Sequence, residues 1–171
     1  MIIHTAEPGD IPAILLLYNH AIRETTAAWV SREETLDDRQ AWFEGRRKQD
    51  LPVLIASAAD GTLLGFASYG PFRPREGYRL TAEHTVYVDP KAQRRGVGKA
   101  LLLRLLDMAR AQGLHVLVGA VDGQNKASIG LHEALGFEVT GRLPQVGTKF
   151  GRWLDLVFMT KVLTEEDAPE G

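Results

Sequence analysis

A glycine-rich, basic segment at residues 93–99 separates a strand-like run from a long apolar helical stretch. The run at residues 81–88 is rich in β-branched and aromatic residues, and residues 96–112 form an apolar helical pattern that Gly113 closes. Glycine permits turns that other residues cannot adopt, and it lets the backbone approach a ligand closely. The segment therefore predicts a strand-to-helix junction that is open to a bound molecule.

The beginning of this helix is suited to an anion. The first N–H groups of a helix have no intrahelical acceptor and lie at its positive end, where they bind phosphate oxygens. Arg94, Arg95 and Lys99 add cationic donors at the same place. These features predict a phosphate or pyrophosphate site, while a helix start with solvated basic residues stays open as the alternative.

Two common phosphate motifs do not fit the segment. A P-loop requires glycine at position 93 and serine or threonine at position 100, where the chain has Gln93 and Ala100. A dinucleotide-binding fingerprint requires glycine at position 101, which is Leu101. The segment is therefore neither of these motifs.

The rest of the chain alternates strand-like and helix-like segments, with no internal repeat and no linker. An antiparallel front half followed by strand, helix, strand, helix and strand predicts one α/β (α+β) domain, a mixed sheet of about seven strands with about four helices. Asp10 is expected to cap the first helix, and Thr35 with Asp38 to form a capping box at the second. Residues 141–151 are expected to be turn-rich. The domain is expected over residues 1–163, before an acidic flexible tail at residues 164–171.

Composition excludes several classes of chemistry. A chain of 171 residues is the length of one compact domain, and with no cysteine it has no thiolate nucleophile, disulfide or cysteine-ligated metal. The five histidines show no metal-ligand spacing, so no metal is expected. With 20 basic and 22 acidic residues the chain is no general binder of nucleic acid. It shows no signal peptide and no apolar run of membrane length, so we expect a cytoplasmic protein with no membrane partner.

Two motifs in register identify a family resemblance. Residues 93–98 match the pattern Q/R-x-x-G-x-G/A, and residues 125–137 match a helix opened by asparagine and ended by Gly-Phe. In order, separation and context they resemble the GNAT acetyltransferase superfamily, from residue 2 to about residue 163. Residues 18–22, 26–29, 83–88 and 131–133 further resemble the phosphinothricin and methionine sulfoximine N-acetyltransferases. This resemblance implies acetyl-CoA as co-substrate, a small amino-acid-like acceptor and a homodimer with the acceptor pocket near its interface.

The resemblance also implies a cofactor site and an acceptor site. Pyrophosphate would bind at Arg94, Arg95, Gly96, Val97, Gly98 and Lys99, and pantetheine along Val86, Tyr87 and Val88. Asn125 would bind pantetheine or cap its helix. The acceptor would contact Arg73, Pro74, Arg75, Glu83, His84 and Thr85, with Trp29 lining the pocket or packing in the core. Arginine binds a carboxylate through two parallel hydrogen bonds, although a merely solubilising role for the two loop arginines stays open.

Two residues are implied in catalysis. Glu83 matches the family's catalytic glutamate, so it is expected to take the ammonium proton, directly or through water. The alternative is a strand residue that is merely polar. His84 should point to the opposite face of the strand. His132 stands where many members carry the tyrosine that protonates the CoA thiolate, and histidine can deliver a proton near neutral pH. A supporting, structural role is the alternative that we favour for His132.

The resulting hypothesis is an N-acetyltransferase that transfers acetyl directly to the α-amine of phosphinothricin, methionine sulfoximine, methionine sulfone or a similar compound. One alternative is another amine acceptor: a polyamine, an aminoglycoside or a protein N-terminus. The loop arginines Arg73 and Arg75 argue against a polyamine pocket, which should be acidic. The other alternative is a non-catalytic acyl-CoA-binding module, against which the presence of Glu83 counts.

Overall fold

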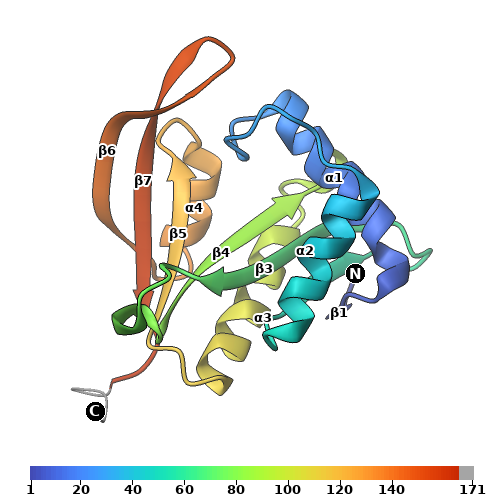
Figure 1. The fold of residues 1–171 in the computed structure, drawn as a ribbon, viewed down its shortest axis with the longest axis horizontal. Coiled ribbons are helices and arrows are strands. Elements are labelled where there is room, and N and C mark those ends of the chain that lie inside the picture. Colours follow the sequence, from blue (N-terminus) through green and yellow to red (C-terminus); the bar gives the residue numbers. More distant parts are fainter. Residues whose placement is uncertain (166–171) are drawn as a thin grey trace.

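The computed structural model describes residues 1–165, in which seven strands form one sheet with α-helices on both faces (Figure 1). The strands are β1 (Ile2–Thr5), β2 (Val53–Ser57), β3 (Leu63–Pro71), β4 (Thr81–Val88), β5 (Val116–Asp122), β6 (Glu138–Lys149) and β7 (Arg152–Val162). The α-helices are α1 (Ile11–Glu24), α2 (Leu36–Lys48), α3 (Val97–Ala111) and α4 (Lys126–Glu133). The expected sheet and helices are confirmed. The acidic tail expected at residues 164–171 lies, from residue 166 on, outside the described residues.

The sheet is mixed. Its strand order is β1-β2-β3-β4-β5-β7-β6, and every neighbouring pair is antiparallel except β4 with β5. The antiparallel front half expected from the sequence is the β1–β4 part. The single parallel pair lies at the centre of the sheet, where the helical connection through α3 crosses from β4 to β5.

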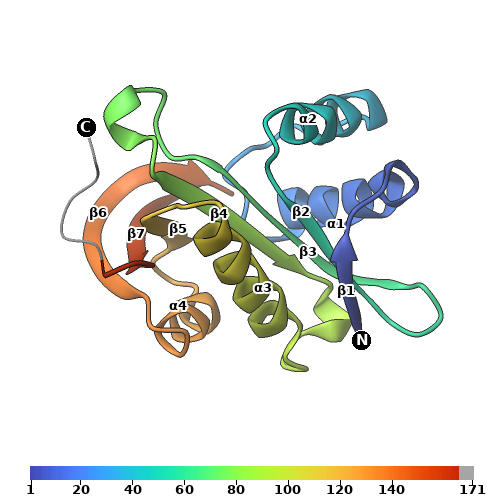
Figure 2. The same ribbon diagram turned by 90° about the horizontal axis from the view of Figure 1, so that it is seen from below.

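Two layers of helices enclose the sheet. Helices α1 and α2 cover one face, and α3 and α4 cover the other (Figure 2). Because side chains alternate between the two faces of the sheet, the same strands contribute to a hydrophobic core on each face. Leu54 and Ala67 pack with α3, while their neighbours Ile55 and Phe66 pack with α1 and α2. Each large apolar side chain buried in this way stabilises the fold by roughly 1.5–3 kcal/mol. No helix within residues 1–165 has the length and apolar character needed to cross a membrane.

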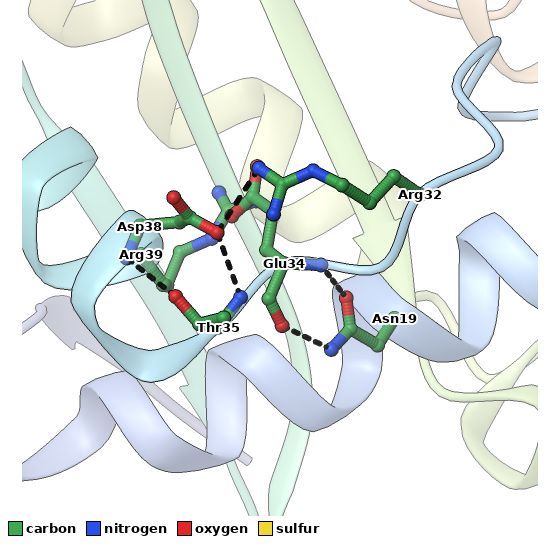
Figure 3. Close-up of polar contacts among 6 residues, drawn as sticks. All are labelled: Asn19, Arg32, Glu34, Thr35, Asp38 and Arg39. Carbon is green, nitrogen blue, oxygen red and sulfur yellow. Dashed lines mark hydrogen bonds and ion pairs between the residues drawn. The ribbon is translucent and has the colours of Figure 1, made fainter.

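The helix ends largely follow the sequence signals. The Thr35 side chain accepts a hydrogen bond from the Asp38 N–H at 3.2 Å, and the Asp38 carboxylate accepts from the Thr35 N–H at 2.9 Å, as the capping box predicts (Figure 3). Asp10 stands at the N-cap of α1 but its carboxylate turns back to the Glu7 N–H at 2.8 Å, so it does not bond to the helix. Gly113 ends α3 with a φ of +72°.

The expectation of turn-rich chain at residues 141–151 is wrong for most of that stretch. Strand β6 continues to Lys149 and pairs with β7 on both sides of two irregularities, between Val139 and Gly141 and between Leu143 and Gly147. These irregularities accommodate residues that normally interrupt strands. Pro144 is tolerated because β6 is the edge strand, where a missing N–H breaks no ladder on the open side.

Candidate active site

The sheet splits between β4 and β5. Their parallel pairing runs from Thr81 opposite Val116 to His84 opposite Gly119, after which the two strands continue apart (Figure 1). On its other edge β4 stays paired with β3 as far as Val88. The split, which we call the wedge, therefore has one free strand edge along β4.

Every second residue of β4 directs its backbone groups into the wedge. The Thr81 carbonyl and the Asp89 N–H both form hydrogen bonds on the β3 side. Because successive residues of a strand direct these groups to opposite edges, the N–H and C=O of Val86 and Val88 face the wedge. An extended ligand could bind there as a further strand would.

The side chains along this edge are already packed. Val86 and Val88 pack against the core under α3. The ring of Tyr87 stacks on Phe66, with 5.1 Å between ring centroids, and meets Tyr18 edge-on at 5.3 Å. A ligand in the wedge would therefore meet the backbone of Val86 and Val88 rather than side chains.

The start of α3 lies at the mouth of the wedge. Gly96 adopts a φ of +80° and Arg94 one of +59°, so the turn uses the left-handed backbone expected of a glycine-rich junction. The first intrahelical bond runs from the Ala100 N–H to the Gly96 carbonyl, which leaves the preceding N–H groups free for a ligand. A Cβ on Gly98 would lie 3.2 Å from the Leu131 side chain, so glycine keeps this approach open.

The cations expected at this turn surround the same helix end. Arg94, Arg95 and Lys99 are all exposed, and none of them forms an ion pair within residues 1–165. Free N–H groups, three unpaired cations and a glycine cradle fit an anionic group such as a pyrophosphate. The donor set at this end of the wedge could therefore hold a pyrophosphate.

Glu83 stands at the closed end of the wedge, on the face covered by α1 and α2. It pairs with Gly70 on β3 and with Val118 on β5, one residue before the last pair of the parallel ladder. Its side chain is half-buried, which raises the pKa of its carboxyl, while the charge of Arg73 acts in the opposite direction. A carboxylate in this setting is suited to accept a proton near neutral pH.

The structure brings only part of the predicted acceptor set together. Arg73, Pro74 and Arg75 lie exposed on the loop after β3, and Arg73 is near enough to Glu83 to influence its pKa. Thr85 is exposed and projects on the same face of β4 as Glu83. The Trp29 ring lies against β6 instead.

Trp29 and Asn125 are engaged in local structure. The Trp29 Nε1 donates to the Thr26 carbonyl at 2.8 Å, and its ring lies against Gly147 of β6, where a Cβ would collide with it. The Asn125 side chain accepts from the Ser128 N–H at 3.0 Å. The capping alternative for Asn125 is therefore confirmed.

His84 and His132 form a buried pair on the opposite face from Glu83. Their Nε2 atoms are 3.2 Å apart and the rings stack with 5.0 Å between centroids. Gly119 makes the space, because a Cβ there would come within 2.9 Å of His132 Nε2 and 3.1 Å of His84 Nε2. The sequence predicted that His84 would point away from the face of Glu83 but missed this contact between residues 48 positions apart.

The hydrogen bonds define the protonation of this pair. The Ser128 carbonyl can only accept, so the His132 Nδ1 at 2.7 Å donates to it. The neutral ring of His132 then has an accepting Nε2, to which the His84 Nε2 donates, and the His84 Nδ1 is buried without a hydrogen bond. Burial lowers the pKa of both imidazoles, that of His84 to about 3, which keeps the pair neutral.

Two cavities lie on the face of Glu83. One, of about 310 Å³, is flanked by Thr81 and Val118, the neighbours of Glu83, and by the rings of Phe72, Tyr78 and Phe158. The other, of about 110 Å³, lies under α1 and α2; its lining residues are Tyr18, Glu34, Arg39, Trp42, Arg46, Phe66, Thr85 and Tyr87. We call the second the inner cavity.

The inner cavity contains charged residues that the sequence analysis missed. Arg39 is 3% exposed, pairs with Glu34 at 2.6 Å and lies over the rings of Tyr18 and Trp42 at 3.9 and 4.5 Å. The signal was present in α2, where Arg39, Trp42 and Arg46 follow at helical spacing and share one face. Because α2 carries charges on both faces, its sequence does not show which of them point into the protein.

Comparisons with known proteins agree with this geometry. The acetyltransferase (GNAT) family matches residues 14–137. An L-methionine sulfoximine/L-methionine sulfone acetyltransferase of Pseudomonas paraeruginosa is 54% identical over 157 residues, covering 92% of this chain and 91% of the relative. A phosphinothricin N-acetyltransferase of Alcaligenes faecalis is 40% identical, covering 96% and 84%.

A solved structure matches the whole fold. The structure of yncA from Salmonella typhimurium, solved with its cofactor acetyl-CoA, superposes with a TM-score of 0.96 at 48% identity. The superposition covers 99% of this chain and 98% of that one. The sheet with its wedge is therefore the same fold as that of a protein that binds acetyl-CoA.

Proposed function

The chain belongs to the GNAT acetyltransferase family, and on that premise we propose that it acetylates the α-amine of small amino-acid analogues. The donor is acetyl-CoA, and the acceptors are of the methionine sulfoximine, methionine sulfone and phosphinothricin type, on which its relatives act. The observation that carries the proposal is the half-buried carboxylate of Glu83 at the closed end of the wedge. At that position a proton acceptor lies next to a site that could hold an extended donor of the acetyl group.

The residues of the wedge fit acetyl-CoA. The N–H groups at the start of α3, with Arg94, Arg95 and Lys99, would hold the pyrophosphate. The free edge of β4 at Val86 and Val88 would bond to the pantetheine amides as a neighbouring strand would. Bound acetyl-CoA supplies the acetyl group as a thioester.

The chain's own residues would do two things in the reaction. Glu83 takes the proton of the acceptor's ammonium, directly or through water, and so frees the amine. A backbone N–H of β4 in the wedge donates to the thioester oxygen as negative charge develops on it. The chain has no cysteine to hold the acetyl group on a thiol, which suits direct transfer: the amine attacks the thioester carbon, the C–N bond forms as the C–S bond breaks, and CoA leaves as a thiolate that takes up the second proton of the amine.

We assign His132 a supporting role. Its Nε2 accepts a hydrogen bond from His84 and its Nδ1 proton is bonded to the Ser128 carbonyl, so the neutral ring has no proton directed at the wedge. Its side chain is 4% exposed. These contacts support positioning of α4 beside the wedge rather than protonation of a leaving thiolate.

The acceptor and the oligomer are proposed as follows. Arg73, Pro74 and Arg75 border the acceptor site from the exposed loop, with Glu83 and Thr85 on the strand. Exposed apolar side chains on the β6–β7 hairpin, among them Phe150 at 54% and Trp153 at 69%, support an interface with a second copy. The homodimer, the cytoplasmic location and the absence of nucleic-acid and membrane partners stay predictions.

The test is CoA release from acetyl-CoA with methionine sulfone, methionine sulfoximine, phosphinothricin, spermidine and an aminoglycoside. We expect release with the first three. Glu83→Gln should lower kcat/KM by about a hundredfold or more, because the amide accepts no proton. The matched control is Glu76→Gln, a change of an exposed glutamate on the nearby loop, which should leave kcat/KM within about threefold.

Each other outcome would point to a different conclusion. Release with spermidine or the aminoglycoside alone would favour the other acceptor class. Binding of acetyl-CoA without release from any acceptor would favour a non-catalytic module. Unchanged turnover in Glu83→Gln at pH 7 would remove Glu83 as the base.

A further inference from the structure

The guanidinium of Arg46 on α2 is half-buried and has no carboxylate partner within residues 1–165. Its Nε is fully buried and forms no hydrogen bond. Burial lowers the pKa of Arg46, and the like charge of Arg39 acts in the same direction. Two cations enclosed side by side are unfavourable unless an anion joins them.

The other two charged groups of the cluster pair with each other, although the Arg39 Nε, like that of Arg46, is buried without a hydrogen bond. Glu34 pairs with Arg39, and its backbone is held by Asn19, whose side chain accepts from the Glu34 N–H and donates to its carbonyl, both at 2.9 Å (Figure 3). Arg39 is fixed between the rings of Tyr18 and Trp42. Two guanidinium groups and one carboxylate line the inner cavity, so its lining carries a net positive charge.

Arg46 lies on the sheet beside Glu83. Its guanidinium occupies the space over Gly70, where a Cβ would collide with Nη1. Gly70 is the β3 partner of Glu83, and the side chains of paired residues project on the same face with Cβ atoms about 4.5–5.5 Å apart. The cation is therefore one strand away from the carboxylate of the proposed base and on the same side of the sheet.

The inner cavity has the size and walls of a subsite for a small anion. Its volume is about 110 Å³, which leaves room for a small anionic group such as a carboxylate. Thr85, two residues after Glu83, lines it on the sheet, and Arg39 and Arg46 line it from α2. Aromatic walls exclude water and so strengthen the attraction between a guanidinium and an anion.

We propose that Arg46 binds the α-carboxylate of the acceptor while Glu83 takes the proton of its α-ammonium. An α-amino acid carries both groups on one carbon, so its two charges match a carboxylate and a guanidinium on neighbouring positions of one face. The assignment rests on the proposed function. It makes Arg46 the residue that binds the carboxylate in the inner cavity. Arg73 and Arg75 lie on the exposed loop and do not line this cavity.

The experiment compares methionine sulfone with its carboxamide as acceptors. The wild-type enzyme should favour the free acid in kcat/KM by about ten- to a hundredfold. Arg46→Met should remove this preference mainly through KM, and Arg46→Lys should keep part of it, since the ammonium is a single point charge. Arg47→Met is the matched control, because Arg47 is exposed on the next position of α2, pairs with Glu44 and lies over the Phe43 ring, and none of these residues lines the inner cavity.

Structural damage and recognition give different results. If Arg46→Met weakened turnover of the acid and the amide equally, Arg46 would have a structural role and the assignment would be wrong. If Arg73→Met removed the preference and Arg46→Met did not, the exposed loop would read the carboxylate. Thermal unfolding and acetyl-CoA affinity of each variant report on the fold.

A binding measurement tests the carboxylate subsite at Arg46 independently of the proposed acetyltransferase function. If the wild-type protein released no CoA with either acceptor, the proposed function would be wrong, but methionine sulfone could still be titrated by its shift of the unfolding temperature. A shift in the wild type that Arg46→Met abolishes supports the carboxylate subsite. An equal shift in both, or none in the wild type, overturns it.

Discussion

The buried imidazoles of His84 and His132 should make the folded state sensitive to acid. Burial holds the pKa of His84 at about 3, against an ordinary value of 6.5, and also lowers the pKa of His132. Between pH 6.5 and about pH 3 the unfolded chain binds more protons than the folded one. The free energy of unfolding therefore falls as the pH falls below about 6.5. One such group changes the free energy of unfolding by about 1.4 kcal/mol per pH unit.

Urea unfolding between pH 7.5 and pH 4.5 measures this dependence. His84→Gln removes one of the two titrating groups and should flatten the slope, although its stability at pH 7.5 will be lower. His4→Gln changes an exposed histidine on β1 and should keep the slope of the wild type. A wild-type stability that is constant from pH 6.5 to pH 4.5 would contradict neutral buried imidazoles.

At the residue scale, the sequence predicted what depends on local geometry. Strand alternation placed Glu83 and His84 on opposite faces, and the structure confirms this. The stack of His84 on His132 could not be predicted, because it depends on how α4 packs across β5 and on the space that Gly119 leaves. The position of the Arg46 guanidinium could not be predicted either, because it depends on the packing of α2 on β3, where Gly70 leaves the space for it.

At the element scale, β6 is tied to the loop between α1 and α2. The buried ammonium of Lys149 donates to the carbonyls of Thr25, at 2.7 Å, and of Ala28. Lys149→Met should destabilise the protein by about 1.5–3 kcal/mol, because two carbonyls lose a charged donor. Hydrogen exchange should become faster at residues 25–34, since the loop loses its anchor on β6.

Lys48→Met is the control for this prediction. Lys48 is exposed in the last turn of α2, and its replacement should change stability by less than about 1 kcal/mol. Equal stability of the Lys149 and Lys48 variants in urea would show that the Lys149 contacts contribute nothing to the fold. Faster exchange over the whole chain, rather than in the loop, would show a global effect.

The same strand shows where sequence patterns mislead. Gly141, Pro144 and Gly147 are typical of turns, yet β6 runs through all three positions. Two register shifts and an open edge accommodate them, and neither feature is visible in the local sequence. In α3 the local signals and the tertiary structure agree, so its ends matched the prediction.

At the scale of the whole molecule, the sheet has two parts that meet along a short ladder. Strands β1–β4 and β5–β7 are joined in the sheet only by the pairs from Thr81 to His84 among the described residues. The order of strands and helices could be predicted because each segment carries its own pattern. The split could not, because it results from how far two strands stay paired.

A ligand that fills the wedge should therefore stabilise the whole fold. Acetyl-CoA at a hundred times its Kd should add about 2.7 kcal/mol to the free energy of unfolding. For a chain of this length that raises Tm by roughly 5–10 °C. Gly98→Val should reduce the rise at the same concentration, because the new side chain would press on Leu131 and Val88 and narrow the approach to the wedge.

Gly45→Ala serves as the control, since a Cβ there meets nothing within 4 Å and α2 lies away from the mouth of the wedge. Its Tm without ligand can rise, because alanine favours the helix, but the added rise with acetyl-CoA should equal that of the wild type. Differential scanning calorimetry of the three proteins over a series of acetyl-CoA concentrations measures both quantities. An equal rise in Gly98→Val and the wild type would mean that the ligand does not pass the start of α3, and the placement of the pyrophosphate there would be wrong.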